Sequence, residues 1–362
     1  MAANLILAAA LALACDLEAP SGAAGCTRAE VDALKMNALQ AVGTHNSYKL
    51  AISPAELAAI ARADPRQALA LDYAHAPLRD QLDAGARQLE LDLLYDPEGG
   101  RYARPLGQQL PGAAPYDLAP LERPGLKVMH VQDIDYRSSC PLFRLCLEEI
   151  RAWSDAHPDH APIAILINLK EGGLAGVSGA TEAVAFDAVA MDAVDREIRA
   201  EFGPERLITP DTVQGAHPTL REAVAAGAWP TLGAARGKVF FALDAPPSQV
   251  EIYRGARRSL EGRAMFVNVD EASPAAAYIT LNDPKADGAR IAAALAAGLI
   301  VRTRADADTV EARAGDASRR EAAFASGAQY VSTDYMNPDP RLGDYRVQLP
   351  GGGVARLRSA GR

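Results

Sequence analysis

Residues 39–48 read Leu39-Gln40-Ala41-Val42-Gly43-Thr44-His45-Asn46-Ser47-Tyr48, an apolar run followed directly by polar side chains. The run predicts a β-strand over Leu39–Thr44, with His45 at its carboxyl end. A second stretch reads Gln88-Leu89-Glu90-Leu91-Asp92-Leu93-Leu94 and places two acidic side chains on one face of another strand. A third apolar run ends in His130. Three strands in succession therefore end in side chains that can move protons or bind cations.

Apolar runs and Ala-rich amphipathic stretches alternate along the rest of the chain. Eight runs predict strands, at Leu39–Thr44, Gln88–Leu94, Leu126–Val131, Pro162–Leu169, Lys238–Leu243, Ala264–Val269, Leu299–Thr303 and Gln329–Thr333. Helical patterns cover Leu78–Gly85, Cys146–His157, Ala180–Glu201, Asp287–Gly298 and Arg319–Ser326. We expect an α/β fold consisting of a single TIM-like (β/α)8 barrel, whose strand-end side chains gather at one mouth. These side chains are His45, Asp92, His130, Glu171, Asp244, Asp270, Arg304 and Asp334.

Composition narrows the class of partner. The chain has 362 residues, with 37 basic and 46 acidic side chains, so its formal net charge is −9. A surface of this sign argues against nucleic acid as a partner.

We expect residues 1–14 to be a signal peptide, 15–37 an N-terminal segment, 38–345 the barrel domain and 346–362 a C-terminal tail.

The N-terminal residues and the cysteines both indicate export. An apolar segment over 5–14 suits a signal peptide and is too short to span a bilayer, and no later segment is apolar enough to do so. We expect a secreted or periplasmic protein, with a lipoprotein as the alternative because Cys15 or Cys26 could be acylated. A disulfide can close the short loop between Cys140 and Cys146, and Cys15 can pair with Cys26 if both survive processing. No Cys-x-x-Cys pair is present, so structural zinc is not expected.

His45 and His130 are candidate acid/base residues. Imidazole titrates near neutral pH, so one histidine can accept a proton while another donates one. Either residue alone has an equally good interpretation as a structural histidine. Together with the acidic pair they favour a catalytic site.

Glu90 and Asp92 lie two positions apart on a predicted strand and share a face. Two carboxylates that point into a barrel repel each other unless a cation lies between them. Oxygen ligands suit calcium or magnesium, and the Asn46 amide oxygen can join them. Because leucines occupy the opposite face, a metal site is a better interpretation than a pair of solvated acids.

The fourth predicted strand ends in Asn168, Lys170 and Glu171. Glu171 is a candidate further metal ligand, and Lys170 can hold a phosphate. A salt-linked rim of the barrel explains these residues equally well. Arg304 and Lys127 are further candidate phosphate contacts.

These motifs resemble a known family. Thr44-His45-Asn46-Ser47-Tyr48, the Glu-x-Asp of Glu90 and Asp92, and His130 are similar to the signature of phosphoinositide-specific phospholipase C, especially its calcium-dependent bacterial branch. The stretch from Gly85 to Asp92 adds to this resemblance, which extends from about Leu39 to Glu171 and more loosely to Asp334. The resemblance implies a barrel of the phospholipase C-like phosphodiesterase type.

The resemblance also implies a role for each motif. His45 would take the proton of the inositol 2-hydroxyl, and His130 would protonate the diacylglycerol oxygen. Asn46, Glu90 and Asp92 would hold one calcium ion, with magnesium as the alternative. The family's fourth metal carboxylate falls where Lys170 and Glu171 compete, and we assign Glu171. A self-contained, monomeric barrel acting on phospholipid at a membrane surface is implied.

Two alternative functions remain within this fold. Glycerophosphodiester phosphodiesterases resemble this barrel and metal site, but they carry a His-Arg-Gly motif at the first strand. This chain has His45-Asn46-Ser47 at that position, which counts against this alternative. A non-catalytic binding barrel is the other alternative, and the retention of both histidines and the acidic pair counts against it.

Overall fold

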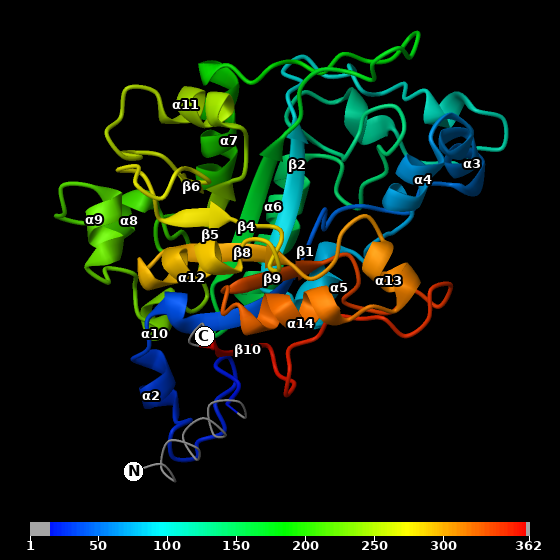
Figure 1. The fold of residues 1–362 in the computed structure, drawn as a ribbon. Coiled ribbons are helices and arrows are strands. Elements are labelled where there is room, and N and C mark those ends of the chain that lie inside the picture. The colour runs from blue at the N-terminus through cyan, green and yellow to red at the C-terminus, as the bar shows by residue number, and fades with distance from the viewer. Residues whose placement is uncertain (1–14, 360–362) are drawn as a thin grey trace.

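A nearly closed barrel of eight parallel strands forms the centre of the molecule (Figure 1). The computed structural model describes residues 15–359. The barrel strands are β1 (Leu39–Thr44), β2 (Gln88–Leu94), β4 (Ile163–Leu169), β5 (Val239–Leu243), β6 (Met265–Val267), β7 (Tyr278–Thr280), β8 (Ile300–Arg304) and β9 (Tyr330–Thr333). They lie in the order β6-β5-β4-β2-β1-β9-β8-β7, and a parallel bridge between Asn268 and Tyr278 brings β6 next to β7. The predicted α/β barrel is confirmed.

One of the eight predicted barrel strands is wrong. The predicted strand Leu126–Val131 is reduced to β3 (Lys127–Val128), which pairs antiparallel with β2 outside the ring. In the ring β2 therefore pairs directly with β4, and the eighth strand is β7, which lies between β8 and β6 and is only three residues long. So short a run carries too little periodicity to be recognised as a strand from sequence.

Helices follow most of the barrel strands and cover the outside of the ring (Figure 1). They are α2 (Arg28–Asp32), α3 (Pro54–Ala63), α4 (Pro65–Leu71), α5 (Leu78–Asp83), α6 (Phe143–Ala156), α7 (Ala188–Glu201), α8 (Pro210–Gln214), α9 (Leu220–Ala225), α10 (Leu232–Ala235), α11 (Pro247–Arg254), α12 (Gly288–Ala296), α13 (Val310–Ala314) and α14 (Ser318–Ala325). Short 3-10 helices occupy η1 (Met36–Ala38), η2 (Gly107–Gln109) and η3 (Ala119–Glu122). All five predicted helical segments contain a helix, although α7 begins eight residues later than expected.

Burial explains the composition of the central strands. All six residues of β1 and all seven of β2 are buried, because one face of each strand packs inside the barrel and the other packs under helices. β1 and β2 approach closely where Gly43 faces Gln88. A Cβ on Gly43 would lie 2.4 Å from the Gln88 Cβ, so only glycine fits at this point.

The amino end of the barrel is closed by segments from both ends of the described chain. β10 (Ala355–Leu357) pairs antiparallel with the start of β1, so part of the predicted C-terminal tail belongs to the sheet. Leu17 N donates to Ala355 O at 2.7 Å. The disulfide Cys15–Cys26 links two residues of this N-terminal segment. The disulfide Cys140–Cys146 joins a residue before α6 to a residue in its first turn. The predicted Cys140–Cys146 pair is confirmed, and the pairing of Cys15 with Cys26, which the sequence left open, is present as well.

Two sequence-based expectations concern membranes. The predicted signal peptide, residues 1–14, lies outside the described residues. Between residues 15 and 359, no helix is long and apolar enough to cross a bilayer.

Candidate active site

The turn after β1 is fixed by hydrogen bonds to both neighbouring strands. His45 N donates to Thr333 O on β9 at 3.1 Å, and Ser47 N donates to Glu90 O on β2 at 3.0 Å. Ser47 Oγ accepts a further bond from Glu90 N at 2.8 Å. Between these anchors Asn46 has a φ of 49°, a left-handed conformation that asparagine tolerates better than most residues. The turn therefore holds His45 and Asn46 rigidly at the carboxyl end of the barrel.

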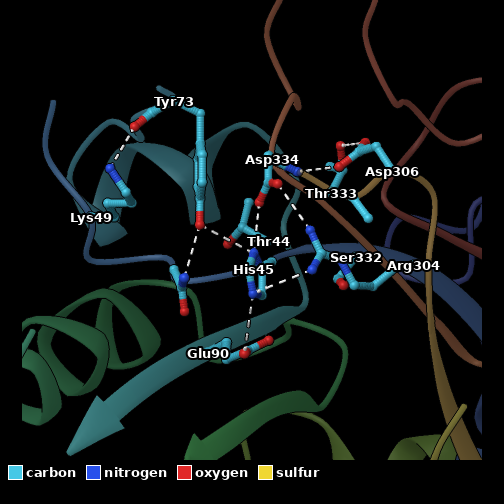
Figure 2. Close-up of polar contacts among 12 residues, drawn as sticks. Thr44, His45, Lys49, Tyr73, Glu90, Arg304, Asp306, Ser332, Thr333 and Asp334 are labelled. Atoms are coloured by element: carbon cyan, nitrogen blue, oxygen red, sulfur yellow. Dashed lines mark hydrogen bonds and ion pairs between the residues drawn. The ribbon is translucent and has the colours of Figure 1, made fainter. Parts of the chain in front are cut away.

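His45 lies between an acidic and a basic side chain (Figure 2). Its Nδ1 lies 2.8 Å from Asp334 Oδ1, which fixes the proton on Nδ1 and leaves the lone pair on Nε2. Arg304 Nη1 is 3.4 Å from Nε2, and the same guanidinium donates to Asp334 Oδ2 at 2.9 Å. Figure 2 also shows Glu90 beside the ring, with its Oε1 3.8 Å from Nε2.

Burial lowers the pKa of His45 well below its ordinary value, and the charges of Arg304 and Arg302 act in the same direction. The imidazole is therefore neutral at neutral pH. Nε2 is available to accept a proton, as a general base requires.

His130 is held by a second buried aspartate. Met129 N donates to Asp92 O at 3.3 Å, which places the residue after it beside the carboxyl end of β2. His130 Nδ1 lies 2.8 Å from Asp135 Oδ2, and Lys49 Nζ lies 3.2 Å from the other oxygen of that carboxylate. Although burial raises the pKa of Asp135, Lys49 and the hydrogen bond with His130 together hold it below its ordinary value. Asp135 is therefore ionised and orients the imidazole so that Nε2 is free.

Glu90 is surrounded by side chains from neighbouring strands. It accepts hydrogen bonds from Arg302 Nη2 on β8 at 2.5 Å and from Asn168 Nδ2 on β4 at 2.8 Å. Burial raises the pKa of Glu90 to about 7; Asp92 acts in the same direction, whereas Arg302 opposes the shift.

Asp92 is fully buried and pairs in register with Asn168. Lys170 Nζ lies 2.8 Å from its Oδ2 as an ion pair. Neither carboxylate oxygen, however, accepts a well-aligned hydrogen bond from any described residue. A buried carboxylate without such bonds is costly unless a ligand joins it.

This chemistry fits a calcium ion. Asp92 supplies unsatisfied oxygens, and Asn46 donates from Nδ2 to the Tyr73 hydroxyl at 2.8 Å, an arrangement that leaves its amide oxygen for another partner. Within residues 15–359 no cluster of three or more His, Cys, Asp or Glu side chains is arranged as a metal site. The carboxylate of Asp92 and the amide oxygen of Asn46 are oxygen donors of the kind that calcium accepts.

Two of the predicted site residues lie away from this group. Glu171 is exposed, and its Oε1 accepts a hydrogen bond from Phe186 N at 2.7 Å, so the structure does not bring it to the acidic pair. Lys127 is fully buried, and its Nζ lies 3.1 Å from Asp96 Oδ2 and donates to Gly125 O at the same distance. The Lys127 ammonium thus anchors β3 in this structure. The other predicted residues, His45, Asn46, Glu90, Asp92, His130, Lys170 and Arg304, lie in the linked set described above.

Sequence reasoning missed several residues that hold this site. Asp334 was recognised only as a strand-end residue, and Asp135 was not recognised at all, yet each fixes one histidine. Arg302 shares the inward face of β8 with Arg304, a spacing of two that could have revealed it. Lys49 gave no signal, because nothing near it in sequence indicates its buried partner.

The chain is similar to a known protein family and to several solved structures. The family model for calcium-dependent phosphoinositide phospholipase C matches residues 34–359. Among solved structures, the chain is similar to a calcium-dependent phosphoinositol-specific phospholipase C from a Gram-negative Pseudomonas species, with 19% identity, coverage of 90% of this chain and 96% of that one, and a TM-score of 0.55. It is also similar to a Ca2+-dependent phosphatidylinositol-specific phospholipase C from Streptomyces antibioticus, with 20% identity, coverage of 90% and 99%, and a TM-score of 0.54. These two likenesses establish the barrel fold, and no curated protein sequence matches the chain. Because the family model spans nearly the whole barrel, the chain belongs to the calcium-dependent phosphoinositide phospholipase C family of enzymes.

Proposed function

We propose that this enzyme cleaves phosphatidylinositol into diacylglycerol and an inositol phosphate, which is released first in its 1,2-cyclic form. The observation that carries the proposal is the pair of histidines at one barrel mouth, each bound through Nδ1 to a buried aspartate. Both histidines thus offer Nε2 for proton transfer. Their setting supports a general base and a general acid that act on one phosphodiester.

His45 begins the reaction in this proposal. Its Nε2 takes the proton of the inositol 2-hydroxyl, and the freed oxygen attacks the adjacent phosphorus. Asp334, 2.8 Å from Nδ1, stabilises the imidazolium that forms. Arg304 is bound to the same aspartate and faces Nε2, so its guanidinium can contact the phosphate as the new bond forms.

His130 completes the transfer. The bond between phosphorus and the diacylglycerol oxygen breaks, and His130 gives that oxygen its proton. Asp135 keeps the ring oriented through its contact with Nδ1, so that Nε2 faces the leaving oxygen in this proposal. Lys170 lies beside Asp92 with its side chain 31% exposed, so it can turn toward the phosphate.

Calcium is the proposed cofactor, held by Asn46, Glu90 and Asp92, with Asn168 facing the same site. When bound, the ion would neutralise phosphate charge and make the 2-hydroxyl more acidic. The chain's own residues support this assignment through the two unsatisfied oxygens of Asp92. We further propose that the protein acts outside the cytoplasm, since its two disulfides suit an oxidising compartment. We propose separately that it acts as a monomer.

One assay tests the function. Purified protein is given phosphatidylinositol, glycerophosphoinositol or phosphatidylcholine, each with calcium or with EGTA, and released phosphate esters are quantified. We expect release of inositol phosphate from phosphatidylinositol only with calcium. Turnover of glycerophosphoinositol alone would instead indicate a glycerophosphodiesterase, and activity that survives EGTA would contradict the metal assignment.

A further inference from the structure

Lys49 is a buried lysine that the proposed mechanism does not use. Its side chain is fully buried. Its Nζ lies 3.2 Å from Asp135 Oδ1, donates to Tyr73 O at 2.9 Å and lies 4.7 Å from the centre of the Tyr73 ring. An ammonium without access to water is stable only where fixed partners replace its hydration. Each of these two partners also contacts one histidine of the candidate active site, so Lys49 links the two histidines.

The main chain of Lys49 brings three segments of the protein together. Lys49 forms an antiparallel bridge with Ser138, and its carbonyl oxygen accepts a hydrogen bond from His75 N at 2.8 Å. The lysine is therefore fixed between residues 73–75 and residues 135–138 by backbone contacts alone. Its side chain has a defined starting point from which to reach both segments.

On one side, Lys49 acts on His130 through Asp135. His130 Nδ1 lies 2.8 Å from Asp135 Oδ2, and the ammonium lies beside the other oxygen of the same carboxylate. That oxygen accepts no well-aligned hydrogen bond from residues 15–359, so the ammonium of Lys49 is what compensates for its burial. Without Lys49 the carboxylate would turn or take up a proton, and either change would release His130 from its fixed orientation.

On the other side, Lys49 acts on His45 through Tyr73. Figure 2 shows Tyr73 between Lys49 and His45. The Tyr73 hydroxyl lies 3.3 Å from His45 Nδ1 and accepts a hydrogen bond from Asn46 Nδ2 at 2.8 Å. The Tyr73 ring is also stacked with the imidazole, with 24° between the two planes. Because Lys49 holds both the carbonyl group and the ring of Tyr73, it fixes the tyrosine that supports His45 and Asn46.

We propose that Lys49 is a positioning residue that holds the two histidines of the mouth in register, His130 through Asp135 and His45 through Tyr73. This inference rests on the proposed function for the roles of the two histidines. A general base and a general acid that act on one phosphodiester must be placed relative to each other as well as to their own aspartates. A single ammonium between their supports sets that relative position.

Lys49→Met removes the ammonium and keeps most of the side-chain volume. Arg263→Met is the matched control, because Arg263 is also a buried cation beside a carboxylate and a tyrosine. Its Nη1 lies 3.2 Å from Asp195 Oδ2, its guanidinium lies 4.5 Å from the centre of the Tyr253 ring, and it precedes β6 at the amino end of the barrel. Urea unfolding measures how much stability each variant loses.

The kinetic test is a set of double-mutant cycles. Lys49→Met and Arg263→Met are each made alone and together with His45→Gln or His130→Gln, and calcium-supported hydrolysis of phosphatidylinositol is measured. We expect Lys49→Met alone to lower kcat about 100-fold with little change in KM, since it misplaces reacting groups and removes no substrate contact. Added to either histidine change, it should lower kcat only about tenfold further, because part of its effect acts through the ring already lost.

Arg263→Met separates positioning from stability. It should lower the free energy of unfolding as Lys49→Met does, change kcat by less than about twofold, and combine multiplicatively with both histidine changes. The proposal is overturned if Lys49→Met loses no more activity than Arg263→Met. It is also overturned if Lys49→Met combines multiplicatively with either histidine change, because Lys49 would then not act through that histidine.

A spectroscopic measurement tests the proposal without turnover. The downfield proton NMR signals of the Nδ1–H groups of His45 and His130 are recorded in metal-free protein and assigned with the two His→Gln variants. Lys49→Met should shift both signals and Arg263→Met neither, and two unshifted signals in Lys49→Met would overturn the proposal. If wild type hydrolyses no phosphatidylinositol, the proposed function fails, whereas these signals still decide whether Lys49 positions both rings.

A second variant covers the case in which Lys49→Met does not fold. Lys49→Met combined with Asp135→Asn removes both charges, so no lone carboxylate is left buried. Compared with Asp135→Asn alone, the double variant should shift the Nδ1–H signal of His45, because only the lysine reaches Tyr73. An unchanged His45 signal in this comparison would overturn the proposal.

Discussion

Buried polar side chains at the two ends of the barrel differ in how completely they are hydrogen-bonded. At the amino end, Gln40 donates to Phe324 O and Ala328 O and accepts from Arg356, while Glu18 pairs with Arg87 and also accepts from Ala161 N. At the carboxyl end, Asp92 Oδ1 and the Nε atoms of Arg302 and Arg304 have no hydrogen-bond partner among the described residues, and Asp92 Oδ2 has only its ion pair with Lys170.

This difference separates stability from function within one fold. Satisfied buried groups at the amino end stabilise the barrel, whereas the unsatisfied groups at the mouth cost stability and stay available to a ligand. Substitutions at the two ends should therefore have different consequences. The predictions below run from the largest expected effect to the smallest.

The largest effect is expected at the histidines of the mouth. His45→Gln and His130→Gln should each lower kcat on phosphatidylinositol about 1,000-fold, the usual size of a general acid or base contribution. Steady-state assays with a second substrate, an inositol phosphodiester of p-nitrophenol, separate the two roles. That leaving group needs no proton, so His130→Gln should recover most of its activity on it, whereas His45→Gln should not. Equal recovery in both variants would contradict the assigned roles.

His160, just before β4 at the amino end, should make stability depend on pH. Burial lowers the pKa of His160 to about 4, and its ring nitrogens bond Ser154 Oγ and Ala161 O. The unfolded chain protonates this histidine near pH 6.5, so the folded state loses stability as pH falls from about 6.5 to about 4, by about 3 kcal/mol in total. Urea unfolding of wild type and His160→Gln across this range measures the effect. The two curves should diverge below pH 6.5, and parallel curves would remove His160 as the cause.

A matched pair of carboxylate-to-amide changes compares the two ends directly. Glu18→Gln should lower the free energy of unfolding by about 2 kcal/mol, because it weakens the pairing with buried Arg87, and should leave kcat unchanged. Asp92→Asn should weaken calcium binding about 100-fold and leave the metal-free protein as stable as wild type or more so. Urea unfolding and calorimetric calcium titration measure both variants. A large loss of stability in Asp92→Asn would show that this carboxylate serves the fold.

The smallest effect is expected at Lys170. In the metal-free protein its ammonium lies 2.8 Å from Asp92 Oδ2, where it competes with a divalent cation. Lys170→Met removes this competitor and should tighten calcium binding about tenfold, a coupling typical of two ligands that share a site. Calorimetric titration in the absence of lipid is the measurement, and Lys238→Met on the far side of the molecule serves as a control. Unchanged calcium affinity would show that breaking the ion pair between Lys170 and Asp92 costs no binding free energy.

The residues of the mouth could be predicted from sequence only where they lie on, or directly after, a strand with a clear apolar pattern. Glu90 and Asp92 alternate with leucines, and His45 ends a clear apolar run, so period and position revealed them. Asp135 and Lys49 could not be predicted, because they matter through a buried contact with each other, and sequence alone cannot place their two segments side by side.

The wrongly predicted strand and the position of the Glu171 side chain have the same physical origin. The Leu126–Val131 run looks like the other barrel strands, but Lys127 anchors it to Asp96 outside the ring. Glu171 follows a correctly predicted strand by two residues, yet its side chain turns to Phe186 N because the strand has already ended. Periodicity identifies which face of a strand a residue occupies, and it carries no information about the loop that follows.

The pairing of β10 with β1 has a practical consequence. Both ends of the described chain meet at the amino end of the barrel, where Leu17 N bonds Ala355 O and Leu39 lies opposite Leu357. A protein immobilised on a sensor chip through a tag joined to Ser359 would therefore present its mouth to the flowing solution. The same orientation would let supported vesicles and the captured enzyme meet face to face without any redesign of the barrel.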